Sequence, residues 1–260
     1  MWQRRRIGAR TLGVLVGVLV LALTACAPES PVTEYTGANG SAVRVEWRDY
    51  PGHAYTDPDQ VLQAPVAEKA DDRARNVIRA IERRLTAEFG LEWEHGPGEE
   101  GLYPQEGNGY GGSSLYVTYN SAPRQSDGVP AFDDWERVLE VVDEVAPAYG
   151  FEPVRLEGVS VSGEESAVEP ERADEDGVWQ WSAAARAGGQ WLDVSITDIE
   201  RDPSGDAEKE MAGAIDAGWS GQSVSLSYGA TTLHHRDRET FLERLQPFRG
   251  LERPAATTSD

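Results

Sequence analysis

Hydrophobic and polar residues alternate most regularly at 178–199, around the glycine pair 188–189. Two glycines between alternating runs predict a tight β-hairpin in which Ala187 pairs with Gln190. This register separates apolar from polar side chains, and a slip of one residue would exchange the two faces. The apolar face is predicted to carry Trp179, Trp181, Ala183, Ala185, Leu192, Val194 and Ile196, and the polar face Gln180, Ser182, Arg186, Trp191, Asp193, Ser195 and Thr197.

Two stretches have the three- and four-residue spacing of apolar side chains that is typical of amphipathic helices. The first is 66–89, followed by Gly90, a residue that often ends a helix. The second is 133–149, which an aspartate is expected to cap. Shorter helices are predicted at 207–217 and 238–245.

Further alternating runs predict strands at 42–48, 91–95, 114–120, 153–161 and 222–228. In one of them the parity of the apolar residues changes at Gly158, which predicts a β-bulge. The order strand, helix, strand, strand, helix, strand allows a ferredoxin-like split βαβ start. We therefore expect one α+β domain over 42–249, with a mostly antiparallel sheet and two main helices on one face.

The first 26 residues have the composition of an export signal. Four arginines precede an apolar run at 12–23, which is shorter than the roughly 20 residues that span a bilayer. The run ends in Leu23-Thr24-Ala25-Cys26, which resembles the lipobox of bacterial lipoproteins. The resemblance implies cleavage before Cys26, transfer of a diacylglycerol to its thiol, and a protein anchored to the cell membrane outside the cytoplasm.

This interpretation divides the chain into a signal peptide (1–25), a flexible lipidated tether (26–41), the folded domain and a disordered tail (250–260). Because Cys26 is the sole cysteine, the mature chain has no disulfide and depends on its hydrophobic core. Four of the 24 basic residues precede Cys26 and all 45 acidic residues follow it, so the mature net charge is −25. Such a charge excludes nucleic acid as an expected partner and leaves membrane attachment to the lipid.

The motifs for catalysis, cofactors and metals are incomplete. The stretch 107–112 matches G-x-G-x-x-G, but a dinucleotide site needs a strand before it and a helix after it. We expect a glycine-rich loop over 96–112, whose tyrosines Tyr103 and Tyr110 could contact a ligand. The acids at 198–206 lack the glycine and glutamate of an EF-hand loop and are expected to be solvated, and the histidines lack the spacing of a zinc site. No catalytic, cofactor or metal site is therefore predicted.

The polar face of the hairpin is the predicted ligand surface. Trp191 lies opposite Arg186 there, and the guanidinium could stack on the indole. If the helices cover only the other face, this surface is open to a peptide or glycan. In the alternative interpretation Trp191 packs under a neighbouring loop or helix.

The stretch 74–199 is similar to the LppA-like lipoproteins of actinobacteria. The similarity lies in the helix ending in Glu92-Trp93, the glycine-rich loop and strand, and the helix 135–149 that closes on Gly150. That family implies an architecture but no activity. We expect a lipid-anchored envelope protein that binds a protein, peptide or glycan without catalysis. An envelope hydrolase, which converging desolvated acids or a Ser–His pair would favour, and a transporter's solute-binding component are the alternatives.

Overall fold

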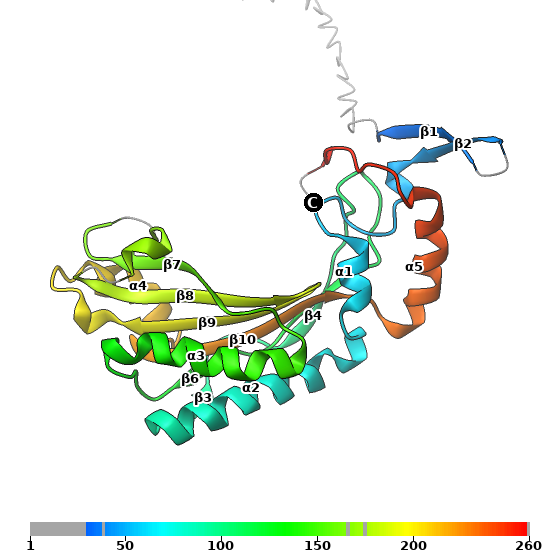
Figure 1. Ribbon diagram of the computed structural model, residues 1–260. Helices are drawn as coiled ribbons and strands as arrows, with labels where there is room; N and C mark the ends of the chain where they lie inside the picture. Colours follow the sequence, from blue (N-terminus) through cyan, green and yellow to red (C-terminus); the bar gives the residue numbers. More distant parts are fainter. Residues whose placement is uncertain (1–29, 38–39, 165–166, 174–175, 259–260) are drawn as a thin grey trace, which may run out of the picture.

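The computed structural model describes residues 30–37, 40–164, 167–173 and 176–258, so the predicted signal peptide and Cys26 lie outside the described residues. Helices and strands alternate irregularly along this part of the chain (Figure 1). The helices are α1 (Pro58–Gln63), α2 (Ala67–Phe89), α3 (Trp135–Val145), α4 (Asp206–Asp216) and α5 (Arg238–Leu245). The strands are β1 (Val32–Thr36), β2 (Ala42–Glu46), β3 (Trp93–His95), β4 (Gly101–Pro104), β5 (Val117–Asn120), β6 (Arg124–Ser126), β7 (Arg155–Val161), β8 (Val178–Ala187), β9 (Gln190–Asp198) and β10 (Gln222–Thr232).

Eight strands form the main sheet, in the order β3-β6-β10-β9-β8-β7. The end of β10 pairs with β5, and β5 pairs with β4, so two short strand pairs share one side of β10. Every pairing in this sheet is antiparallel. The expected α+β class with an antiparallel sheet is therefore confirmed.

The hairpin register is also as predicted. Ala187 lies opposite Gln190 and Arg186 opposite Trp191, with Gly188 at a φ of +58° in the turn. The bulge predicted in β7 is present as a register shift between Leu156 and Gly158. Both features follow from local alternation, because burying one face fixes the parity of each strand.

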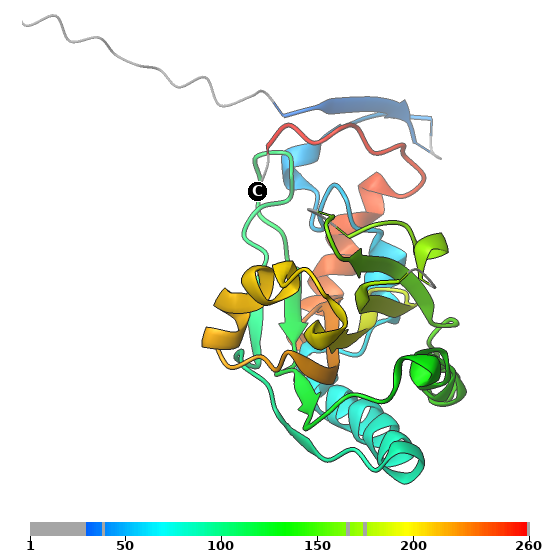
Figure 2. The ribbon, with the colours of Figure 1, turned by 90° about the vertical axis from the view of Figure 1, so that its left-hand side faces the viewer.

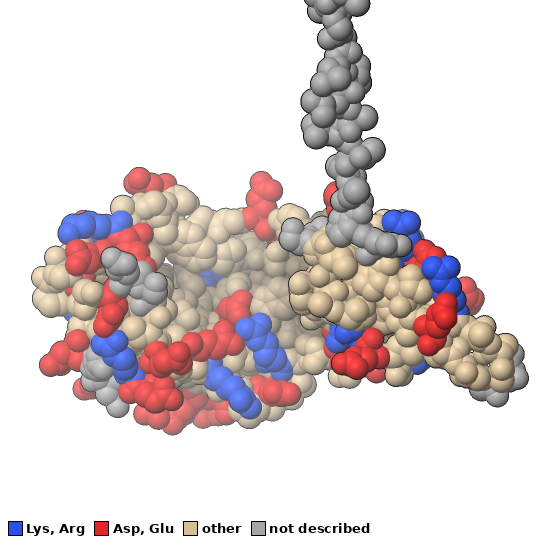
Figure 3. Space-filling view, turned by 90° about the horizontal axis from the view of Figure 1, so that it is seen from above, with Lys and Arg blue, Asp and Glu red and all other residues tan. Residues whose placement is uncertain are grey.

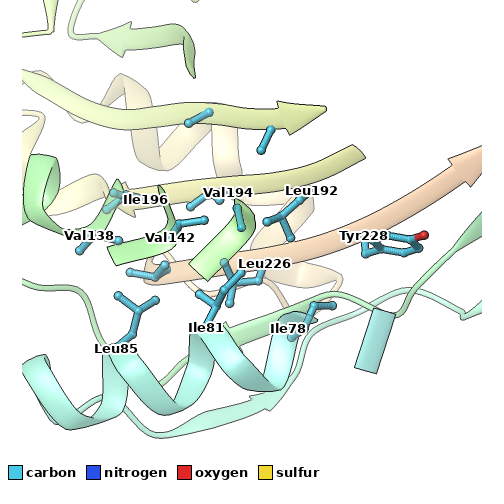
Figure 4. Close-up of a cluster of buried hydrophobic side chains, with 14 of the residues drawn as sticks. Ile78, Ile81, Leu85, Val138, Val142, Leu192, Val194, Ile196, Leu226 and Tyr228 are labelled. Carbon is cyan, nitrogen blue, oxygen red and sulfur yellow. The ribbon is translucent and has the colours of Figure 1, made fainter. Parts of the chain in front are cut away.

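Two helices, α2 and α3, cover the apolar face of the sheet, as expected. Each contributes a stripe of apolar side chains that meets those of β9 and β10 (Figure 4). Ile81 and Leu85 from α2 and Val138 from α3 are fully buried. Gly90 ends α2 in the left-handed conformation that glycine adopts without strain.

The ferredoxin-like start is not formed. The first predicted strand, β2, pairs with β1 in a separate two-stranded sheet instead of joining the main one. The residues 32–36, expected to be part of a flexible tether, are thus a β-strand. Its side chains have partners: the Trp47 indole donates to the Thr33 hydroxyl at 2.9 Å, and the Tyr35 hydroxyl donates to the carbonyl of Pro247 at 3.0 Å.

A second hydrophobic cluster lies at the end of the molecule where β1, β2, α1 and α5 meet (Figure 1). Its centre is a group of buried rings, in which Trp47 lies 5.3 Å from Tyr110 and 5.2 Å from Phe248 between ring centroids. The described part of 42–249 therefore contains two hydrophobic clusters, one under the main sheet and one around Trp47.

The tail expected to be disordered packs on this second cluster over its described residues. The backbone N–H of Thr257 donates to the carbonyl of Gly109 at 2.8 Å, and the Tyr110 hydroxyl donates to that of Pro254 at 3.0 Å. Arg253 donates to the carbonyl of Thr56 at 2.7 Å. A polar composition thus did not predict disorder here, because the tail bonds to backbone groups of a distant loop.

Candidate functional site

The face of the main sheet opposite α2 and α3 carries rows of polar side chains. Antiparallel pairing places Ser182, Ser195 and Ser225 opposite one another on β8, β9 and β10, and Gln125 of β6 continues this row. One step along the strands, Asp193 lies opposite Ser227. Side chains of directly opposed residues share a face and lie close together, so the register alone assembles this surface.

A pocket of about 480 Å³ lies on this polar face. The serine rows and Asp193 form its floor, and α4 with the loop after it forms a wall, through Met211, Ala214 and Trp219. Helix α4 thus lies on the side of the sheet opposite α2 and α3 (Figure 2). Seen from above, the surface between the two ends of the molecule is hollowed and largely free of charged side chains (Figure 3). The polar face is therefore covered at one end and open at the other.

The wall is attached to the sheet by buried polar side chains. Gln125, which is 3 % exposed, accepts from the Ser220 N–H at 3.1 Å and donates to the carbonyl of Gly218 at 3.2 Å. Asp202 accepts from the Ala207 N–H at the start of α4 and from the Ser162 hydroxyl after β7. Asp202 belongs to the acidic stretch expected to be solvated, and that expectation is wrong for this residue, which is buried.

Asp193 is the desolvated acid of the pocket. Burial raises the pKa of its carboxyl; Arg186 lowers it and Glu157 raises it. Among the described residues Asp193 has no hydrogen-bond or ion-pair partner, and the same holds for the Ser225 and Ser227 hydroxyls. Partly buried polar groups without protein partners carry a desolvation penalty, which a bound ligand can offset.

We expect Asp193→Asn to raise the melting temperature at pH 7 by about 2 °C. The raised pKa means that the native state binds this proton more tightly than the unfolded chain, so the ionised carboxylate reduces stability at neutral pH. The gain should vanish below the ordinary pKa of 3.8, where the carboxyl is protonated in both states. Melting curves from pH 3 to pH 7 measure this, with the exposed Asp176→Asn as control. A less stable variant at pH 7 would contradict the prediction.

The predicted cation–π pair is not formed. Arg186 donates from Nη2 to Oε1 of Glu157 at 3.0 Å, and the cation–π contacts in the described residues involve Arg73 and Arg201. Trp191 instead lies over Gly229, the opposite residue on β10, where an added Cβ would lie 2.1 Å from the indole. The indole is partly exposed and packs on its own sheet. It therefore neither stacks with Arg186 nor packs under a loop or helix, the two arrangements expected from the sequence.

The two candidate tyrosines lie in different places. Tyr103 is 46 % exposed on β4, and its pairing through β5 and β10 places it on the same polar face as Trp191. Tyr110 is fully buried in the second cluster, so its expected role on a ligand surface is wrong. The glycine-rich loop around it is built on the buried side chain of Asn108, which bonds to five backbone groups.

The two acids near the pocket have different surroundings. Both Asp193 and Glu157 line the pocket. Glu157 is half-exposed and forms an ion pair with Arg186, so Asp193 is the only one of the two that is desolvated. No histidine is among the described residues that line the pocket. Within those described ranges no group of three His, Cys, Asp or Glu residues could hold a metal ion. The predicted hairpin register placed Asp193 on the polar face, but Asp193 was not proposed as a site residue. The local sequence around Trp219 gave no sign that it lines a pocket.

Two resemblances came from the sequence, and the structure bears on neither family. Cys26 lies outside the described residues. Within 74–199 the two main helices form as expected, whereas β4 lies in the stretch expected to be a loop and β6 where no strand was expected. In the part of the chain that the structure describes, no helix is long and apolar enough to cross a membrane. Comparison of the chain with protein-family models, curated proteins and solved structures finds no match, so the lipobox and the LppA-like similarity stay predictions.

Proposed function

We propose that this chain is a lipid-anchored protein of the cell envelope that binds a ligand, without catalysis, on the polar face of its main sheet. The pocket carries the proposal: it is concave, contains a desolvated and unpartnered Asp193, and leads to the partly exposed ring of Trp191. Binding sites are typically pre-formed hollows with an aromatic surface and a few polar groups that fix orientation.

The chain between the proposed anchor and the fold is short. The first described residue is Ser30, four residues after Cys26, and an extended chain of that length spans at most about 14 Å. A lipid on Cys26 would therefore hold β1 and the second hydrophobic cluster next to the bilayer. This supports a domain seated close to the membrane, with a tether shorter than the 26–41 expected from composition.

We expect Cys26→Ala to move most of the protein from the membrane fraction to the soluble fraction. Two acyl chains are enough for stable anchoring, and the mature net charge of −25 opposes attraction to an anionic membrane surface. Fractionation with a carbonate wash measures this. Ser30→Ala, just beyond the predicted lipobox, should leave the distribution unchanged. A Cys26→Ala variant as firmly bound as the parent would overturn the lipid assignment.

Photo-crosslinking in the native envelope tests the binding function. A photoreactive residue at Ser182, on the open part of the polar face, is expected to capture a ligand. The same residue at Tyr55, which is 77 % exposed in another part of the molecule, serves as the matched control. Capture at Ser182 should be lost in Trp191→Ala. If both positions give the same products, the binding function is wrong.

A hydrolase is the second candidate, favoured by one observation: burial, and to a smaller extent Glu157, raise the pKa of Asp193 in the pocket. A carboxylic acid with a raised pKa can act as a general acid. Turnover of the captured ligand that disappears in Asp193→Asn, while binding persists, would establish this alternative.

A further inference from the structure

Two aromatic side chains lie on glycines of the same row across the sheet. The row runs through Trp191, Gly229, Asn120 and Gly101 on β9, β10, β5 and β4. The indole of Trp191 lies over Gly229, and the phenol of Tyr103 folds back over Gly101, with its hydroxyl 3.3 Å from the position of an added Cβ. A side chain at Gly229 would displace the indole, and one at Gly101 would contact the phenol closely, so both rings lie against the backbone of the sheet.

The spacing of these rings is set by the strands beneath them. Gly229 and Gly101 lie on strands that are separated by β5, which places them two strand spacings, or about 10 Å, apart. Asn120 occupies the position between them, is exposed, and has no side-chain hydrogen bond to another described residue. The row is therefore a strip of two aromatic surfaces with a free amide between them.

Hydrogen-bonding groups continue the strip into the pocket. Asp193 follows Trp191 on the same face of β9, and Ser227 is its cross-strand neighbour. A carboxylate, an amide and hydroxyls around aromatic faces match the surface of a sugar, which presents C–H groups on its ring faces and hydroxyls at its edge. These groups can accept and donate hydrogen bonds at successive positions along the strip, which matches the hydroxyls of successive sugar rings in an oligosaccharide.

Other ligand classes fit this strip less well. An aromatic cage for an alkylammonium ion needs rings around one point, whereas these two rings lie about 10 Å apart. A peptide strand is usually bound by the edge of a sheet, whereas these residues lie on the face of paired strands. The acids Asp193 and Glu157 and the mature charge of −25 oppose a polyanion.

We propose that the ligand is a neutral oligosaccharide that crosses the sheet along this strip, with one sugar ring on Trp191 and another on Tyr103. Asp193, Asn120 and Ser227 accept or donate hydrogen bonds to its hydroxyls. The inference rests on the proposed binding function and assigns its ligand class.

Titration calorimetry of the full chain with defined glycans tests the inference. The probes are cellohexaose, hexa-N-acetylchitohexaose and a linear mannohexaose, the disaccharide of each, and hexagalacturonate as the acidic comparison. At least one neutral hexasaccharide is expected to bind more tightly than its disaccharide, and hexagalacturonate to bind more weakly than that hexasaccharide. Failure of all three neutral hexasaccharides would overturn the inference.

The two rings have separable effects. Trp191→Ala should weaken both the hexasaccharide and its disaccharide about tenfold, because the ring adjoins the pocket. Tyr103→Ala should weaken the hexasaccharide about tenfold and leave the disaccharide unchanged. Tyr55→Ala, in another part of the molecule, should change neither. Equal binding by the wild type and the Trp191 and Tyr103 variants would contradict the proposed strip.

Gly229→Ala supplies a test that keeps both rings in the chain. The added Cβ would displace the indole, so this variant should lose hexasaccharide affinity as Trp191→Ala does, and the double variant should lose no more than either single one. Melting curves show whether each variant is folded. If crosslinking at Ser182 persists while no neutral hexasaccharide binds, the ligand class is wrong and the binding function stands.

Discussion

Asn108→Ala is expected to lower the free energy of unfolding by about 3 kcal/mol. Asn108 is fully buried, and its Nδ2 lies within 3.1 Å of the carbonyls of Trp47, Arg48 and Tyr50. Its Oδ1 accepts from the backbone of the glycine-rich loop. Removal of the amide would leave several buried backbone groups without partners, and each carries the full cost of desolvation.

The surroundings of Asn108 give the structure little room to adjust. An added Cβ at Gly112 would lie 1.7 Å from the carbonyl oxygen of Arg48, so the loop and the segment 47–50 pack backbone to backbone. The C-terminal tail bonds to the same loop through Gly109. The loss of Asn108 should therefore loosen three segments of the second cluster together.

Urea unfolding measures the effect, and Asn120→Ala is its matched control. Asn120 is exposed and has no side-chain hydrogen bond to a described residue, so this variant should lie within about 0.5 kcal/mol of the wild type. Asn108→Asp should be at least as unstable as Asn108→Ala, because its carboxylate would face three carbonyl oxygens. Equal midpoints for Asn108→Ala and Asn120→Ala would show that the amide contributes nothing.

Features that depend on local periodicity could be predicted from the sequence. The pairing of Ala187 with Gln190, the bulge before Gly158 and the end of α2 at Gly90 each follow from residues close together in the chain. The hairpin also placed Trp191 and Asp193 on one polar face, which is half of the candidate site. In these cases burial of one face left a single arrangement.

The other half depends on contacts between distant segments. Tyr103 reaches the face of Trp191 only through the pairing of β4, β5 and β10, which local alternation does not encode. The placement of Tyr110 and of the tail depends on contacts such as the bond from Tyr110 to Pro254, two residues that lie 144 positions apart. The wall of the pocket likewise depends on Asp202, which was expected to be solvated, and on Gln125, for which the sequence made no prediction; both are buried.

Asp202→Asn is the second change with a large expected effect, because it releases the wall of the pocket. The carboxylate of Asp202 accepts from the Ser162 hydroxyl at 2.5 Å, the Ser204 hydroxyl at 2.7 Å and the Ala207 N–H at 2.7 Å. Burial raises the pKa of Asp202, but these hydrogen bonds hold it far below its ordinary value of 3.8. An amide offers one acceptor in place of two, so we expect a loss of about 2 kcal/mol.

The pH dependence separates this role from simple packing. Because the native pKa is depressed, the ionised Asp202 stabilises the fold fully above pH 3.8, and this stabilisation is lost as the pH falls below that value. The difference between the wild type and Asp202→Asn should thus be constant from about pH 7 to pH 5 and shrink toward pH 2. Asp216→Asn, at an exposed position at the end of α4, should be close to neutral. A difference that is unchanged at low pH would rule out the carboxylate as its source.

Hydrogen exchange locates the loss within the fold. Asp202 links the start of α4 to the end of β7, whereas α2 packs on the other face of the sheet, so Asp202→Asn should speed exchange in α4 and leave α2 protected. Because Met211 and Ala214 of α4 line the pocket, the same variant should also weaken ligand binding while Trp191 stays in place. Faster exchange throughout the chain would instead mean that Asp202 supports the whole fold and that the wall has no stability of its own.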